Sequence, residues 1–171
     1  TMIGQDFSGM NLTLTQFREA NLTECDFRKA ELTQTSFMEA DLTRAKFDGA
    51  NAPQAIFYGS TLTGASLQKV NLEQASLQKC VLTRADLRGC NLVQAQMEGA
   101  ICDGALFGGS DLTYADMSHV VLKDCDMTKL SLDRTNTHQL LDSGSLWQGT
   151  DRSMALGTDK QRLEAEKWEA K

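Results

Sequence analysis

A large apolar residue recurs every five residues along most of the chain. From Phe7 to Leu132 every fifth position holds leucine, phenylalanine or methionine, except for Ala52 and Cys102. An α-helix turns about 100° per residue, so a five-residue step would scatter these side chains around its surface. A straight strand would send alternate members to opposite faces. The period therefore predicts a chain that turns a corner within each repeat and winds around its own apolar interior.

The positions around each apolar centre repeat as well. Two residues before the centre stands a small residue, usually alanine, with cysteine as a near-isostere at Cys25, Cys80, Cys90 and Cys125. Asp or Asn often precedes the centre, Thr often follows it, and Gly recurs at the last position, as a corner with unusual φ would favour. Pro53 predicts a local distortion, because proline cannot donate to a ladder of hydrogen bonds. Self-similarity at a fixed period is typical of a solenoid.

This A(D/N)LTX pattern closely resembles the pentapeptide-repeat family over residues 5 to about 134. The resemblance implies an all-β fold, a right-handed quadrilateral parallel β-helix in which four pentapeptides form one square coil. About 26 repeats would then form about 6–7 coils, stacked at ~4.8 Å into a rod ~30 Å long. We number the four sides of the coil from the side centred on Phe7, so that Leu12, Phe17 and Leu22 begin sides two, three and four.

The chain divides into two expected parts. Residues 1–135 would form the β-helix, and residues 136–171 would form a capping segment in which the repeat pattern fades. Thr158 and Gln161 fit a capping box, which predicts a helix over about 159–170. We expect apolar residues of this segment to cover the open end of the coil, namely Leu140, Leu141, Leu146, Trp147, Met154 and Leu156. In the family, C-terminal segments often cap the coil or mediate head-to-head dimers, so the candidates for capping or dimer contacts are Leu146, Trp147, Leu163 and Trp168.

The sequence gives no candidate for catalysis, a metal or a cofactor. The five cysteines form no C-x-x-C motif and occupy inward positions, so we expect free, buried thiols. His119 and His138 lie apart from each other and from any cysteine cluster, which argues against a metal site. Carboxylates recur with the repeat at outward positions, so paired acids need no acid–base role. We therefore expect a protein that is not an enzyme and that needs no cofactor.

One outward column departs from the repeat. The residue before the centre is Val81, Ile101 and Val121 in three successive coils, which stacks these side chains on side four, and Leu141 continues the spacing. Exposed apolar patches often mark contacts, so one interpretation is a partner-binding or self-association site. The other is that the C-terminal tail covers the column, or that the residues are tolerated strand formers. Met38 and Tyr58 form a smaller row on side three, to which the same alternatives apply.

The net charge of −6 raises the question of DNA mimicry. Some members of the family resemble duplex DNA and bind DNA gyrase or topoisomerase IV. The most acidic wall here is side two, with a net charge of about −3 along ~30 Å, whereas duplex DNA carries about one charge per 1.7 Å. The charge pattern therefore gives this function little support.

We expect a bacterial protein that acts as a rigid, non-enzymatic protein-binding or scaffold module, with a homodimer through the C-terminal end as one assembly. Two alternatives are a DNA mimic that binds DNA gyrase or topoisomerase IV, and an adaptor or effector of a secretion system. No stretch of 18 apolar residues and no secretory signal is present in the sequence. We therefore expect no membrane insertion, no direct nucleic-acid binding, and a cytoplasmic location or secretion without a cleavable signal.

Overall fold

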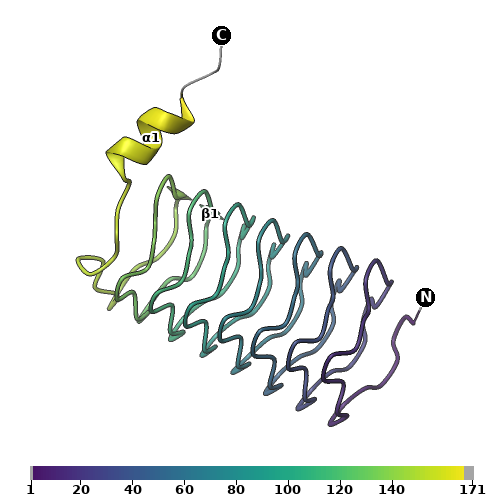
Figure 1. Ribbon diagram of the computed structural model, residues 1–171. Coiled ribbons are helices and arrows are strands. Elements are labelled where there is room, and N and C mark those ends of the chain that lie inside the picture. Colours follow the sequence, from purple (N-terminus) through teal and green to yellow (C-terminus); the bar gives the residue numbers. More distant parts are fainter. Residues whose placement is uncertain (1, 168–171) are drawn as a thin grey trace.

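The chain is wound into square coils that stack into a rod (Figure 1). The computed structural model describes residues 2–167. Parallel bridges join residues twenty positions apart, from Asp6↔Asp26 to Asn136↔Leu156. Strands β1 (Val121–Lys123) and β2 (Leu141–Ser143) form a parallel pair, and α1 (Lys160–Glu166) follows at the C-terminal end of the rod. The fold class is confirmed: it is a quadrilateral parallel β-helix with a short C-terminal helix.

The corners of the coils share one backbone conformation. Every fifth residue from Gly4 to Gly149 has φ between 50° and 80°, and 19 of these residues are not glycine while 11 are. The positive φ of a corner therefore does not by itself require glycine, contrary to the expectation from the recurring glycines in the sequence. At one corner glycine also leaves room for a long side chain in the preceding coil, because a Cβ on Gly149 would lie 3.3 Å from Cγ of Lys129. The corners continue past residue 135, so the coil runs beyond the point where the repeat pattern fades.

The repeat centres line the interior of the rod. Leucine, phenylalanine and methionine at these positions are almost completely buried in the middle coils. The rings form two stacks with centroids 4.9–5.4 Å apart, and rings of opposite stacks meet edge to face at 5.3–5.9 Å. The two stacks are Phe7–Phe27–Phe47 and Phe17–Phe37–Phe57. Both arrangements are favourable for aromatic pairs.

Where Asp or Asn precedes a centre, it commonly closes a small turn. Its side-chain oxygen accepts a hydrogen bond from the N–H of the residue two positions later, as from Thr43 to Asp41 (3.0 Å) and from Val93 to Asn91 (3.1 Å). Such Asx turns satisfy a backbone donor that the coil-to-coil ladder does not use. This turn explains why Asp and Asn recur in the sequence.

The expected distortion at Pro53 is wrong. The neighbouring N–H groups of Ala52 and Gln54 donate to Asn71 and Glu73 in the next coil, both at 2.8 Å. The ladder uses the N–H groups of the centre and of the corner but not that of the residue between them. Proline at position 53 therefore removes no ladder hydrogen bond.

The C-terminal segment differs from expectation in two respects. Asp159, not Thr158, caps α1, and its side chain accepts hydrogen bonds from the N–H groups of Gln161 and Arg162. The hydroxyl of Thr158 instead accepts a hydrogen bond from the N–H of Gln139 (3.2 Å). Leu140 and Trp147 pack against the core, whereas four other residues expected to cover the end are at least 55% exposed: Leu141, Leu146, Met154 and Leu156. No helix among the described residues is long and apolar enough to cross a membrane.

Candidate protein-binding face

Side four carries an apolar stripe, which we define as Val81, Ile101, Val121 and Leu141. Bridges join each of these residues to the next, so they lie directly above one another on four successive coils. Ile101 is 42% exposed and Leu141 is 62% exposed, while Val81 and Val121 are half-buried. The described part of α1 therefore does not cover the stripe.

The stripe lacks the hydrogen bond that stabilises the ordinary repeat. A valine, isoleucine or leucine side chain cannot accept the N–H of the residue two positions later, whereas Asp41 on the same side accepts that of Thr43. A hydrogen bond of this kind contributes about 0.5–1.5 kcal/mol to stability. Single apolar residues occupy this position on other sides, at Ile56, Leu106 and Leu146, but only on side four do four of them stack. A stack of residues that give up local hydrogen bonds favours a role in contact.

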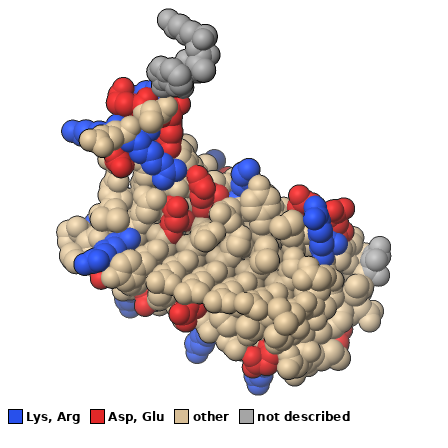
Figure 2. Space-filling view, viewed as in Figure 1, with Lys and Arg blue, Asp and Glu red and all other residues tan. Residues whose placement is uncertain are grey.

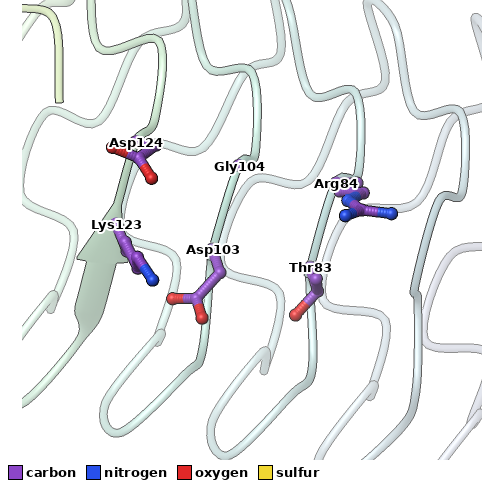
Figure 3. A pocket seen from close by; sticks show the side chains of 6 residues that line it. All are labelled: Thr83, Arg84, Asp103, Gly104, Lys123 and Asp124. Atoms are coloured by element: carbon purple, nitrogen blue, oxygen red, sulfur yellow. The ribbon is translucent and has the colours of Figure 1, made fainter. Parts of the chain in front are cut away.

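A row of charges runs beside the stripe on the same side. Figure 3 shows the side chains of Arg84, Asp103, Lys123 and Asp124 projecting from three successive coils around a shallow pocket. None of these four groups forms an ion pair with another described residue. One carboxylate oxygen of Asp103 is buried without a hydrogen-bond partner. Some other charges of the described chain are paired, as Arg44 is with Glu24 at 2.9 Å, whereas this row offers unpaired groups of both signs side by side.

A second cluster joins α1 to side three. The ring of His138 is 1% exposed, and its Nδ1 accepts a hydrogen bond from the N–H of Asp159 (3.1 Å). Its Nε2 lies 3.1 Å from Oε2 of Glu166, and Arg162 donates to Oε1 of the same carboxylate at 2.8 Å. His138 therefore contacts both ends of α1 and positions the helix on the coil.

The cluster resembles a metal site only in its atom types. His119, His138 and Glu166 bring their ligand atoms within 4.8 Å of one another, so the two histidines do not lie apart in the fold. Because Nδ1 of His138 accepts the Asp159 N–H, a neutral ring carries its proton on Nε2 and donates it to Glu166. A neutral ring that binds a metal through Nε2 carries its proton on Nδ1 and donates it to an acceptor. Here that proton would point at the N–H of Asp159, which is itself a donor. The geometry favours a hydrogen-bonded contact.

A sequence model of pentapeptide repeats matches residues 3–37, 35–74, 65–101 and 100–136. These matches together span residues 3–136, which is well over half of the chain. The chain belongs to the pentapeptide-repeat family. A comparison with curated proteins finds no match.

Several solved structures of pentapeptide-repeat proteins are similar to this one. HetL from the cyanobacterium Nostoc sp. strain PCC 7120 is 17% identical, with a TM-score of 0.49 over 93% of this chain and 92% of HetL. A thylakoid-lumen protein from Arabidopsis thaliana is 29% identical, with a TM-score of 0.40 over 70% of this chain and 66% of that protein. Full-length QnrB1, a plasmid-mediated fluoroquinolone resistance protein, is 21% identical, with a TM-score of 0.40 over 95% of this chain and 84% of QnrB1.

The other candidate residues of this pentapeptide-repeat protein are dispersed. Met38 and Tyr58 are half-buried on side three, and Nζ of Lys79 lies 5.5 Å from the centroid of the Tyr58 ring. Trp147 donates from Nε1 to Asp142 at 2.8 Å, and Leu163 is half-buried on α1. Trp168 lies outside the described residues. A role of these residues in partner or dimer contacts stays a prediction.

Sequence reasoning missed the charged row and the contact of α1 with the coil. Asp103 and Lys123 stand twenty residues apart, the same spacing that identifies the stripe, so the row could have been found by the same rule. His119 and His138 are nineteen residues apart, which on a twenty-residue coil makes them diagonal neighbours, with ring centroids 5.4 Å apart. Nothing in the repeat predicts that Glu166 reaches them.

Proposed function

We propose that this pentapeptide-repeat protein is a non-enzymatic binding module that presents side four to a protein partner. The observation that carries the proposal is the apolar stripe, whose four residues stack on adjacent coils at positions where the repeat often places an Asx-turn acceptor. The free charges of Arg84, Asp103, Lys123 and Asp124 supply polar contacts at its edge. Because the coil is fixed by a continuous hydrogen-bond ladder, the face offers these groups at a constant spacing of about 4.8 Å with little ordering entropy to lose on binding.

A DNA mimic that binds gyrase receives less support from the surface. Side two, the most acidic wall, carries ladders of neutral amides, in which Gln34, Gln54, Gln74 and Gln94 bond to one another at 2.7–2.8 Å. Figure 2 shows the charges of one view in small mixed groups separated by broad uncharged areas. A gyrase supercoiling assay tests this alternative, and an adaptor role in a secretion system is compatible with the proposed face.

The experiment compares proteins captured from the host by the full chain and by two variants. In the first, Val81, Ile101 and Val121 are replaced together by Asp; in the matched control, Ile56 and Leu106, which occupy the same repeat position on other sides, are replaced by Asp. We expect the first variant to lose a partner that both the original chain and the control retain. Identical capture by all three, with unchanged oligomeric state, would contradict the proposal.

A further inference from the structure

We infer that the partner of side four is a second copy of this chain, packed antiparallel with stripe against stripe. The inference rests on the proposed function and names the occupant of the same face. Four successive coils of side four, which we call rows, carry it. Each row has an apolar residue before the centre and polar or small residues after it. The two residues that follow the centre in the four rows are Thr83–Arg84, Asp103–Gly104, Lys123–Asp124 and Ser143–Gly144.

When a second copy is turned end to end and laid against side four, its charges meet opposite charges on the first copy. Consider a two-fold axis that lies in the interface, perpendicular to the rod, between the rows of Ile101 and Val121. It places Ile101 on Val121 of the second copy and Val81 on Leu141, so the two stripes bury each other. The same operation places Asp103 opposite Lys123 of the second copy, twice by symmetry, as in an isologous interface.

The remaining charges fit the same arrangement. Arg84 comes to lie one row, about 4.8 Å, from Asp124 of the second copy, within reach of its long side chain. A parallel arrangement about an axis along the rod and through the stripe would also bring the two stripes together, but it would place the two charged columns on opposite edges of the contact, where they do not face each other. Of these two arrangements, the antiparallel one sets opposite charges against each other across the contact, so the charges favour it. Each of these four groups is without an ion pair to another described residue of its own chain, and each gains an opposite charge in the pair.

The size of the face sets the strength of the contact. The stripe is only about 14 Å long, because its four rows are spaced by about 4.8 Å. A contact limited to these four rows is short compared with a standard interface, which buries ~800 Å² per partner. We therefore expect a weak dimer with a dissociation constant in the micromolar range, formed when the local concentration is high.

Charge exchange tests this arrangement on the full chain. Sedimentation velocity over about 1–500 μM should show a monomer–dimer equilibrium for the original chain. Asp103→Lys and Lys123→Asp each create two like-charged pairs across the axis, so each should weaken the dimer at least about tenfold. The double variant Asp103→Lys/Lys123→Asp restores both pairs and should recover the original dissociation constant within about threefold. Melting curves of all four proteins show whether each is folded.

Two results would overturn the inference. One is a chain that stays monomeric up to about 500 μM. If the stripe variant nevertheless loses a captured partner, the proposed binding function survives without self-association. The other is a dimer that is indifferent to the charge exchange but is lost in Leu163→Asp, which would place the contact at the C-terminal end. A dimer that Leu163→Asp leaves intact and that charge exchange restores supports the inference.

Discussion

Nε2 of His138 lies 3.1 Å from Oε2 of Glu166, and this contact joins the last turn of α1 to a side chain buried in the coil wall. A helix of seven residues is too short to be stable alone, so its order depends on docking. The contact thus marks the point where the periodic fold ends and a specific tertiary contact takes over.

Replacing Glu166 with Gln should release α1 without affecting the coil. The amide keeps the size of the side chain but loses the charge that Arg162 and His138 contact. We expect the ¹³Cα shifts of residues 160–166 to move toward random-coil values while the melting temperature of the coil is retained. Glu164→Gln is the matched control, since Glu164 is on the same helix and its side chain is 76% exposed. Equal helicity in both variants would argue against docking through Glu166.

The docking of α1 should weaken in acid. The hydrogen bonds from His138 and then Arg162 lower the pKa of Glu166 from 4.5 to about 2. A depressed carboxyl pKa contributes stability above the unfolded value and loses it as pH falls through the folded value. Helicity of residues 160–166, followed by ¹³Cα shifts, should therefore decline between about pH 4.5 and pH 2. The Glu166→Gln variant should lack this titration step; the same step in that variant would assign it to another group.

The five thiols should be unreactive in the folded protein. All five are free and buried, and burial raises the pKa of Cys80 to about 11 and that of Cys90 to about 12. The thiolate is the reactive form, so Ellman's reagent should react with them at pH 8 only after unfolding. Denaturant should then release five equivalents. Prompt reaction of any thiol in the native protein would show that the wall opens at that coil.

Proline should be tolerated after a centre that has no Asx turn before it. Thr33 follows Glu31 and Leu32 and stands in the same column as Pro53, so Thr33→Pro removes no ladder hydrogen bond. Thr113 donates its N–H to Asp111 at 2.9 Å, and Thr113→Pro loses this bond. We expect Thr113→Pro to be less stable by about 1 kcal/mol or more, and Thr33→Pro to be neutral or slightly stabilised, by denaturant unfolding. The opposite ranking would refute our explanation of Pro53.

The periodic part of the fold could be predicted because each repeat carries its own constraints. Phe27 and Leu32 had to face inward once the five-residue step excluded helices and straight strands. The error at Pro53 came from assuming that every N–H serves the ladder. The end of the chain was less predictable because its contacts are unique. The hydroxyl of Thr158 accepts a hydrogen bond from Gln139, and Asp159 caps the helix in its place. The contact between Glu166 and His138 joins residues whose spacing does not follow the repeat.

The central claim is that the apolar stripe serves contact and not the stability of the coil. The measurement that tests it most directly is the thermal unfolding of a variant in which Val81, Ile101 and Val121 are replaced together by Asn. This variant copies the column Asn51–Asn71–Asn91, whose amides bond to one another at 2.9 and 3.0 Å, and it restores the Asx turns on side four. We predict a melting temperature equal to or above that of the original chain. A fall of about 5 °C or more would mean that the stripe stabilises the fold itself, and would contradict the claim.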